Sequence, residues 1–335
     1  MSKLKNNVTD IHGILLGHAQ DLEGMTGCSV VLYPDGAVGG VDQRGGAPGT
    51  RETDLLRPMH LVDKVHAILL SGGSAYGLDA ASGVMRYLEE NGIGFDTGVA
   101  KVPIVPAAVI FDLMIGRADV RPDAKMGYEA CMNAAISNLE QGNVGAGTGA
   151  TVGKLLGVEQ SMKSGLGSAT IDVGNGLLVS ALVVVNAFGD VYDPETNQIL
   201  AGTRTLIKGP IKGGMGDYFA DTLATMKTFA GKTILGIATE HNTVIGVIVT
   251  NAKLNKEETN KVAQMAHDGL ARAIRPAHTM MDGDTIFALA TGKKTANVNL
   301  IGAYGAEAFT RAIINAVNTA KPLANLPSSN SLHIG

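Results

Sequence analysis

The feature that most constrains this chain is a run of valine and isoleucine from Val244 to Val249, interrupted only by Gly246, that follows directly after the polar pair Asn242-Thr243. A short apolar run of β-branched residues is typical of a buried strand, and we expect this strand to reach Ala252. An Asn-Thr pair in front of such a strand is ordinarily a turn into β structure. The segment therefore predicts a buried strand that starts at a polar residue.

The same pair also has a chemical interpretation. If the Asn242-Thr243 bond were cut, Thr243 would carry a hydroxyl nucleophile and a free α-amine on one residue. The ordinary pKa of an α-amine, about 7.7–8.0, would let it take the hydroxyl proton near neutral pH. Taken alone, the pair favours the turn.

Hydrophobic periodicity predicts a mixed α/β chain. Apolar runs predict strands at residues 28–36, 37–42, 65–70, 177–185 and 285–290. The first two are expected to form a hairpin through a Pro-Asp-Gly turn. Helical spacing predicts helices at residues 75–90, 128–139, 217–229, 256–274 and 305–319. Residues 202–216 predict an exposed connection, and the absence of repeats and obvious linkers favours one domain over residues 1–335.

Composition limits the classes of function. Of the 335 residues, 45% are hydrophobic and 17% charged, which describes a globular chain rather than a disordered one. The net charge is −4 without a basic cluster, so neither nucleic acid nor a membrane is an expected partner. The sequence has no secretory signal and no apolar run of about 18 residues, which predicts a cytoplasmic protein. Because Cys28, Cys131 and the histidines lack disulfide or metal-ligand spacing, buried thiols and no metal are expected.

Two carboxylates precede the strand predicted at residues 285–290, in the sequence Asp282-Gly283-Asp284. In extended backbone, residues i and i+2 face the same side, so both carboxylates would converge on one point. Close carboxylates shift each other's pKa and can orient an ammonium or a hydroxyl. The alternative is a solvated Asp-Gly turn, which the dipeptide alone favours.

Lys154 follows the glycine-rich residues 145–153. Glycine-rich backbone before a lysine can hold a phosphate, but that pattern requires Ser or Thr after the lysine, and Leu155 stands there. Nucleotide binding is therefore not expected. Lys154 is instead a candidate cation for pairing with Asp282 or Asp284 and for lowering the pKa of a neighbouring amine, and the alternative is a surface lysine.

Asn186 ends the long aliphatic run at residues 177–185, where its amide must find partners or line a site. Its NH2 group could donate to a developing oxyanion, and the alternative is a capping or turn asparagine. The glycine segments at residues 45–54 and 71–77 could bring backbone N–H groups near a ligand or reflect close backbone packing alone. No Ser-His-Asp pattern is spelled locally, so histidine is not the expected base.

Together these segments resemble the P1 peptidases, the family related to L-aminopeptidase/D-esterase, β-aminopeptidases and the nylon-oligomer (6-aminohexanoate-oligomer) hydrolase. The resemblance spans most of the chain in an ordered set of motifs, at residues 41–46, 72–78, 145–147, 184–186, 242–243 and 278–284. Members of this family are similar to N-terminal-nucleophile hydrolases, whose precursor cuts itself before a Ser or Thr. The resemblance implies an α/β (α+β) fold with four layers, an αββα sandwich.

The resemblance implies roles for matching residues of this sequence. It makes Thr243 the nucleophile and Asn242 the residue before the cut, which gives an α chain of residues 1–242 and a β chain of residues 243–335. It places Lys154 and Asn186 in the active site, with Asn186 stabilising the oxyanion. The acidic partners that it implies are Asp282 and Asp284.

One departure from the family concerns the substrate pocket. Phe111 stands where the nylon-oligomer hydrolase has a tyrosine, which puts that enzyme's substrate range in doubt for this chain. We assign Phe111, Gly73, Ser74 and Tyr76 to the predicted pocket. The aminopeptidase branch has Ser-Gly-Glu where this chain has Asp-Gly-Asp, so the Thr-type nylon-oligomer branch is the better match.

The implied activity is that of a self-processing amidohydrolase or aminopeptidase that cleaves amide or ester bonds of small peptides or amino-acid amides through an acyl-enzyme. No cofactor is implied, and a homo-oligomer of αβ units is expected. Two alternatives stay open. One is acyl transfer of the ornithine-acetyltransferase kind, and the other is an uncleaved homologue that only binds small molecules.

Overall fold

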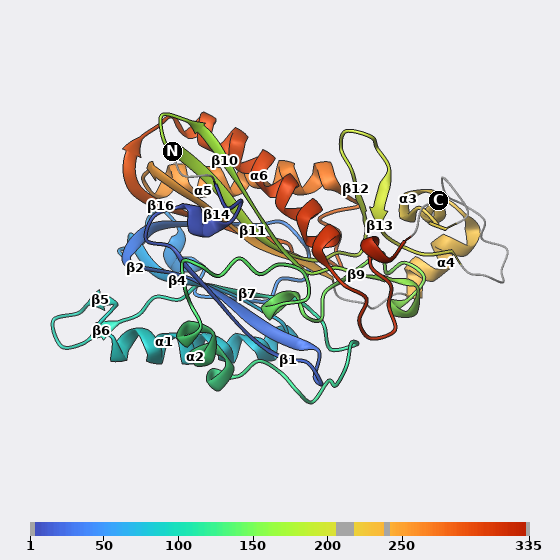
Figure 1. Cartoon of the computed structure of the whole chain (residues 1–335), viewed down its shortest axis with the longest axis horizontal. Helices are drawn as coiled ribbons and strands as arrows, with labels where there is room; N and C mark the ends of the chain where they lie inside the picture. The colour runs from blue at the N-terminus through green and yellow to red at the C-terminus, as the bar shows by residue number, and fades with distance from the viewer. Residues whose placement is uncertain (1–3, 206–217, 238–241, 333–335) are drawn as a thin grey trace.

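The computed structural model describes residues 4–205, 218–237 and 242–332 (Figure 1). Its frame is a nine-stranded mixed sheet, in which β1 (Leu15–Asp21) pairs with β2 to the side of the main path. The main path runs, in spatial order, through β10 (Leu166–Gly174), β11 (Leu177–Asn186), β14 (Thr243–Lys253), β16 (Thr285–Thr295), β2 (Thr26–Gln43), β4 (Lys64–Ser71), β7 (Ala107–Val109) and β3 (Thr50–Arg51). The apolar runs at 177–185 and 244–249 therefore form neighbouring interior strands.

The long strand β2 divides this sheet into two layers. Residues 26–32 pair with β1 and β4, whereas residues 38–43 pair with β16. The predicted hairpin at residues 28–42 is wrong, because residues on both sides of Pro34-Asp35-Gly36 pair with β4 in the same direction. The three residues form a bulge instead, and a bulge bends a strand without reversing it. Gly36 allows the bulge, since its φ of 74° lies in the left-handed region.

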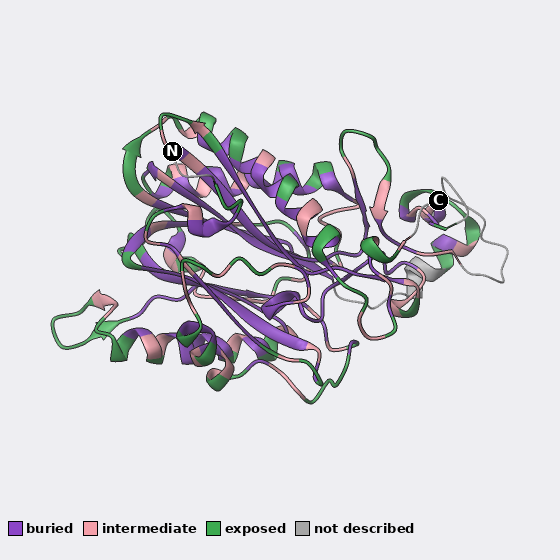
Figure 2. Cartoon of the chain, viewed as in Figure 1, coloured by how far each residue is buried: buried purple, intermediate pink, exposed green. Residues whose placement is uncertain are grey.

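Helices cover the two outer faces of the doubled sheet. α5 (Lys256–Ala273) and α6 (Val298–Thr319) lie over β10, β11, β14 and β16, and α1 (Ala80–Glu90) and α2 (Ala124–Met132) lie over β1, β2 and β4 (Figure 1). The central parts of the long strands are buried, whereas their ends and the outer helix faces are exposed (Figure 2). Three separate hydrophobic cores fill the spaces between the layers. The expected αββα sandwich is confirmed.

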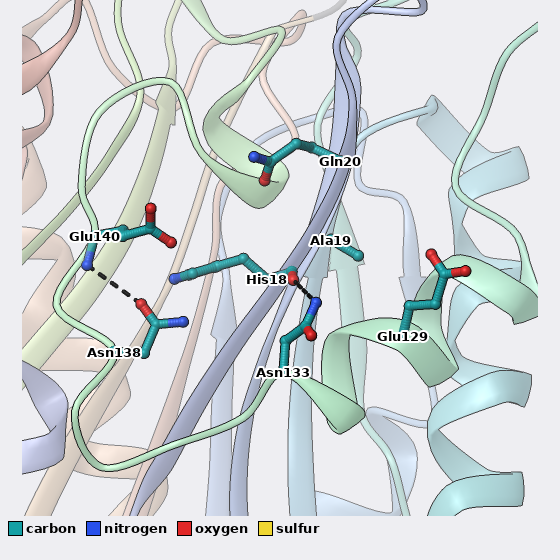
Figure 3. A pocket seen from close by; sticks show the side chains of 7 residues that line it. All are labelled: His18, Ala19, Gln20, Glu129, Asn133, Asn138 and Glu140. Atoms are coloured by element: carbon teal, nitrogen blue, oxygen red, sulfur yellow. Dashed lines mark hydrogen bonds between the residues drawn. The ribbon is translucent and has the colours of Figure 1, made fainter.

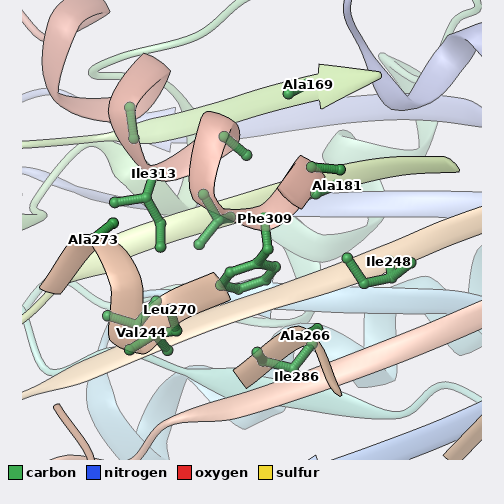
Figure 4. Packing of buried hydrophobic residues seen from close by; sticks show 14 of the residues in the cluster. Ala169, Ala181, Val244, Ile248, Ala266, Leu270, Ala273, Ile286, Phe309 and Ile313 are labelled. Atoms are coloured by element: carbon green, nitrogen blue, oxygen red, sulfur yellow. The ribbon is translucent and has the colours of Figure 1, made fainter. Parts of the chain in front are cut away.

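Side-chain alternation along β14 shows which way its first residue points. Val244 and Ile248 pack against α5 and α6, around Phe309 (Figure 4), whereas Ile245 and Val247 fill the core between the two sheet layers. Thr243 is two residues before Ile245 and so lies on the sheet-to-sheet side. Burial of each such aliphatic side chain contributes about 1.5–3 kcal/mol, which holds this alternation in register.

The remaining strands are short and form three small sheets. They are β12 (Asp190–Tyr192) with β13 (Ile199–Ala201) and β15 (Ile274–Arg275), β5 (Phe95–Asp96) with β6 (Lys101–Val102), and β8 (Thr151–Val152) with β9 (Met162–Lys163). The 3-10 helices are η1 (Val8–Asp10), η2 (Asp54–Leu56), η3 (Ser74–Asp79), η4 (Gly145–Gly147), η5 (Val158–Gln160) and η6 (Ser329–Ser331). Among the described residues, no helix has the length and apolar character needed to cross a membrane.

Capping residues explain where the predicted helix boundaries were right or wrong. α5 starts as predicted, because the Asn255 side chain accepts from the Glu258 N–H while the Glu258 carboxylate accepts from the Asn255 N–H. The helix predicted at residues 128–139 is α2, which begins earlier because Asp123 caps its first turn by accepting from Met126 N. It also ends earlier than predicted, with Asn133 as its C-cap. Residues 75–90 form η3 followed by α1 rather than one continuous helix.

The helix predicted at residues 217–229 is two separate helices. Asp221 caps α3 (Thr222–Met226) by accepting from Ala224 N, and α4 (Phe229–Ile237) follows after a break. Residues 206–217, most of the connection predicted at 202–216, lie outside the described residues.

Candidate active site

The ends of β11 and β14 place Asn186 beside Thr243. The two residues are partners in the antiparallel register of these strands, and both are buried. Asn186 is two residues after Val184, which faces the core between the sheet layers, so its side chain lies on the same side as that of Thr243. The strand register therefore brings an amide and a hydroxyl to the same edge of the inter-sheet core.

The Asn242-Thr243 peptide is held from both sides by backbone. Asn242 N donates to Met281 O, and Gly283 N donates to Asn242 O, each at 2.8 Å. The Thr243 hydroxyl also donates to Asn242 O. The carbonyl at the predicted cut thus accepts a backbone N–H that would stabilise negative charge on its oxygen. Residue periodicity gives no signal for this contact of Gly283, because the contact depends on the chain segment at residues 281–283 lying beside residue 242.

Lys154 lies against Asn186 rather than on the surface. Its ammonium donates to Asn186 Oδ1 at 2.8 Å and to the Asn186 carbonyl at 2.9 Å. Thr151 N also donates to Asn186 Oδ1, at 3.1 Å, and Asn186 Nδ2 donates to the Phe111 carbonyl at 2.9 Å. Three hydrogen bonds, two from Lys154 and one from Thr151, reach the two oxygens of Asn186 and orient its NH2 group away from the lysine.

The two carboxylates of Asp282-Gly283-Asp284 lie just before β16, as predicted. Both are buried, so they do not form the solvated turn that was the alternative. Asp282 Oδ2 accepts from Thr279 N at 2.8 Å and from the Thr279 hydroxyl at 2.6 Å. Burial, followed by repulsion from Asp284, raises the pKa of Asp282 to about 6, against the opposing effects of Thr279 and the Lys154 charge. Asp284 Oδ1 accepts from Val244 N at 2.8 Å, which ties this carboxylate to the residue after Thr243.

His278 takes part in this cluster, although the sequence pointed away from histidine. Its Nδ1 lies 2.7 Å from Asp284 Oδ2, and its backbone N donates to the same oxygen at 3.1 Å. Its ring meets the buried His267 ring edge-on, with centroids 4.8 Å apart. The one feature of the sequence that could have pointed to His278 was its place at the start of the motif at residues 278–284. Periodicity could not have found it, because His278 has a left-handed backbone with φ of 57°.

A pocket of about 230 Å³ opens beside Thr243. It is lined by Thr243 and by small or apolar residues, namely Ala47, Pro48, Gly49, Ser74, Ala75, Val109, Ile110 and Phe111. None of these residues is charged. Of the four residues assigned to a substrate pocket from the sequence, Ser74 and Phe111 line this one. Gly73 and Tyr76 are outside this lining: Gly73 N donates to Asp112 Oδ1 at 2.7 Å, and Tyr76 is exposed with the Arg121 guanidinium 3.7 Å from its ring centroid.

A second, more open pocket of about 450 Å³ lies between β1 and α2 and is lined by polar side chains including His18, Asn133 and Glu140 (Figure 3). It contains none of the predicted site residues. Over the described part of the chain, no three His, Cys, Asp or Glu side chains are grouped so as to hold a metal ion. Both cysteines are free and buried, as predicted.

Comparisons with known proteins show the family of this chain. Residues 6–329 match the model of peptidase family S58. The chain is 43% identical to an uncharacterized aminopeptidase of Mycobacterium tuberculosis, with 98% of each chain covered. It is 33% identical to the 6-aminohexanoate-oligomer endohydrolase of Kocuria sp., with 92% of this chain and 84% of that protein covered.

Solved structures show the same fold at low sequence identity. The L-aminopeptidase D-Ala-esterase/amidase of Ochrobactrum anthropi, described as a variant of the Ntn hydrolase fold, superposes with a TM-score of 0.70 at 15% identity over 96% of this chain and 88% of that one. A β-aminopeptidase of Burkholderia sp. gives 0.66 at 20% identity, over 96% and 88%. The fold is therefore that of the Ntn hydrolases, and with a family match over nearly its whole length the chain belongs to peptidase family S58.

Proposed function

We propose that this chain is a self-processing amidohydrolase. Thr243 first cleaves the Asn242-Thr243 peptide bond and then acts as the nucleophile that attacks the substrate. Membership of a peptidase family supports amide-bond hydrolysis. The observation that carries the finer proposal is the contact of the Thr243 hydroxyl with the Asn242 carbonyl, whose oxygen also accepts from Gly283 N. A nucleophile, its carbonyl and an oxyanion donor thus meet at one peptide bond.

Self-cleavage would proceed by an N-to-O acyl shift. Thr243 Oγ1 attacks the carbonyl carbon of Asn242, and the negative charge that forms on the oxygen is stabilised by Gly283 N–H. The bond between that carbon and Thr243 N then breaks, the nitrogen takes the proton that the hydroxyl gave up, and an ester remains between Asn242 and the Thr243 side-chain oxygen. Water hydrolyses the ester, which releases Asn242 as a carboxylate and Thr243 with a free amine.

Substrate hydrolysis would then repeat the chemistry on another carbonyl. The Thr243 amine takes the proton of its own hydroxyl, directly or through water, while the hydroxyl oxygen attacks the substrate carbonyl carbon. The amine then gives this proton to the leaving nitrogen or oxygen as its bond to the carbonyl carbon breaks. Water hydrolyses the ester that remains, which releases the free acid and restores Thr243. The NH2 group of Asn186 is proposed to donate to the oxyanion, since Lys154 and Thr151 already orient the amide. The carboxylates of Asp282 and Asp284 and the charge of Lys154 set the electrostatic potential around the amine.

The uncharged pocket beside Thr243 supports small amides or peptides as substrates. Its lining offers apolar contact and no charged group, and its volume of about 230 Å³ suits a short acyl group. Phe111 lines the pocket, and its carbonyl accepts from Asn186 Nδ2, a contact that does not require a tyrosine hydroxyl. Related proteins named aminopeptidase and 6-aminohexanoate-oligomer endohydrolase support trying aminoacyl p-nitroanilides, β-peptides and 6-aminohexanoate oligomers.

The test is a pair of variants at the nucleophile. Thr243→Ala should stay one chain of 34.5 kDa and lose activity by at least about 10³-fold, because both steps lose their attacking oxygen. Thr243→Ser, which keeps a hydroxyl, should still be cut between residues 242 and 243. Intact mass and N-terminal sequencing give the result. Two fragments from the alanine variant, or full activity without cleavage, would rule the proposal out.

Acyl transfer is separated from hydrolysis by the acceptor. The cleaved protein, incubated with acetyl-ornithine and a second amine, should release free acid at a rate independent of the amine if water is the acceptor. A rate of acyl-amine formation that rises with the amine concentration and exceeds hydrolysis would identify a transferase instead.

A further inference from the structure

His278 and Asp284 form a pair behind the first hydrogen bond of β14. Asp284 uses one carboxylate oxygen to accept from Val244 N at 2.8 Å and the other to contact His278 Nδ1 at 2.7 Å. Asp284 is buried and His278 is one-fifth exposed. Because each oxygen has its own partner, the carboxylate cannot rotate without losing one of the two contacts.

The backbone and the neighbouring ring hold His278 in this position. Its left-handed φ of 57° brings its backbone N within 3.1 Å of the same Asp284 oxygen that its ring contacts. His267 Nε2 lies 3.1 Å from the Asp42 carbonyl, so this nitrogen is the donor of the His267 ring, which packs edge-on against His278. Asp284 Oδ2 already accepts from the His278 backbone N–H, and we assign His278 Nδ1 as a second donor to the same oxygen.

The His278–Asp284 pair matters more for the position of Thr243 after chain cleavage than before it. Before the cut, residue 243 is held on its N-terminal side through Asn242, which is paired with Met281 and Gly283. After the cut, that covalent tether is gone. Val244 N still donates to the Asp284 side chain, and this hydrogen bond joins the residue next to the new N-terminus to the segment before β16.

We propose that His278 is a positioning residue that holds Asp284 on Val244 N and so fixes Thr243 in the cleaved enzyme. The inference rests on the proposed function, because it concerns the Thr243 residue after self-cleavage. Displacing a reacting group by about 1 Å can cost on the order of 10²-fold in rate, so a loosened N-terminus would lower turnover. Self-cleavage, which takes place while Asn242 still tethers Thr243, would change little.

Two substitutions separate the ring's hydrogen bond from its backbone conformation. His278→Gly removes the ring and tolerates positive φ, whereas His278→Asn tolerates positive φ and keeps an N–H donor close to the place of Nδ1. The matched control is Asn175→Gly, since Asn175 also has a positive φ, of 54°, but lies at the turn between β10 and β11, at the opposite end of β11 from Asn186.

Turnover and cleavage are measured on all three variants. We expect His278→Gly to lower kcat by at least about tenfold with KM changed less than about threefold, and to be cut at a rate within about threefold of the parent. His278→Asn should recover most of kcat, and Asn175→Gly should match the parent. Unchanged kcat in His278→Gly, no recovery in His278→Asn, or cleavage slowed as much as turnover would overturn the inference.

Amide hydrogen exchange at Val244 tests the same inference without any substrate. In the cleaved protein, exchange of the Val244 N–H should be at least about tenfold faster in His278→Gly than in the parent and near the parent rate in His278→Asn. In the uncleavable Thr243→Ala chain, the same glycine substitution should have a smaller effect. An equal effect in both forms would show a purely structural role and contradict the proposal. Activity in Thr243→Ala would instead contradict the proposed function. The exchange rates alone would still decide whether His278 holds Val244.

Discussion

At the scale of single residues, the candidate site is made of polar groups that are buried but paired. Asn186 is fully buried, and the cost of burying its amide is offset by the bonds it makes to Lys154, Thr151 and the Phe111 carbonyl. The cost of burying the Lys154 ammonium is likewise offset, because it donates to two oxygens of Asn186. Asp282 differs, because its burial and its closeness to Asp284 outweigh its bonds to Thr279 and raise its pKa.

Asp282 makes the stability of the chain depend on pH. Its pKa of about 6 exceeds the ordinary value of 3.8, so the folded state binds the proton more tightly than the unfolded state. Below pH 4 the carboxyl is protonated in both states and costs nothing. Above pH 6 it is ionised in both, and two pKa units correspond to about 3 kcal/mol lost from the folded state. Stability attributable to this group therefore falls as the pH rises from 4 to 6.

Substituting Asp282→Asn in the uncleavable Thr243→Ala chain should remove this dependence. We expect equal free energies of unfolding at pH 4 and an excess of about 2–3 kcal/mol for the variant at pH 7, measured by urea denaturation. The exposed Asp35→Asn serves as the control and should show no such excess. A variant less stable than its parent at pH 7 would mean that the carboxylate is stabilised, not penalised, in this site.

At the scale of elements, glycines set how closely helices approach one another. A Cβ on Gly83 of α1 would lie 1.7 Å from the Ala124 carbonyl oxygen, and one on Gly127 of α2 would lie 1.9 Å from the Ala80 carbonyl oxygen. Each glycine therefore accommodates the backbone of the other helix. The contact positions α1 and α2 against β1, β2 and β4, on the outer side of the sheet layer that ends in the pocket segments β7 and η3.

Gly83→Ala and Gly127→Ala should each destabilise the chain by roughly 1–3 kcal/mol, because backbone atoms cannot yield as a flexible side chain does. The double variant should cost less than the sum, since one separation of the helices relieves both contacts. Gly305→Ala in α6 is the matched control. Its Cβ would meet nothing closer than 3.7 Å, so it should raise stability by about 0.5–1 kcal/mol. Thermal denaturation of the four variants checks these signs, and stabilisation by Gly83→Ala would contradict the close approach.

At the scale of the whole molecule, the two predicted fragments are interleaved. Residues 243–335 supply β14, β16, α5 and α6, whereas residues 1–242 supply the strands on both sides of them. β14 pairs with β11, and β16 pairs with β2, so the later fragment occupies the middle of the sheet (Figure 1). The hydrophobic core under α5 and α6 also draws on both fragments.

Self-cleavage should therefore leave the fold intact. We expect both fragments to elute together in native size-exclusion chromatography, at the volume of the uncleaved Thr243→Ala chain, and to separate only in denaturant. Light scattering should give a multiple of the 34.5 kDa αβ unit, in keeping with the proposed homo-oligomer. Release of the 243–335 fragment without denaturant would show that the strand pairing does not hold the cleaved protein together.

Local patterns in the sequence were enough to predict the interior strands and most of the helices. The β-branched run before Ala252 and the aliphatic run before Asn186 became β14 and β11, because β-branched residues and burial act over a few neighbouring positions. The resemblance carried by the ordered motifs was enough to predict the four-layer fold. They also pointed to Thr243, Asn186, Lys154, Asp282 and Asp284, which the structure brings to one end of the sheets.

Long-range pairing decided what the sequence could not. Pro34-Asp35-Gly36 reads locally as a turn, yet β4 continues along both sides of it and makes it a bulge that divides the sheet into two layers. The Gly283 N–H on the Asn242 carbonyl and the His278 ring on Asp284 likewise arise only when residues 278–284 lie beside the start of β14. Sequence patterns thus determined which residues are extended, buried or polar, while the register between distant strands decided which polar groups meet at Thr243.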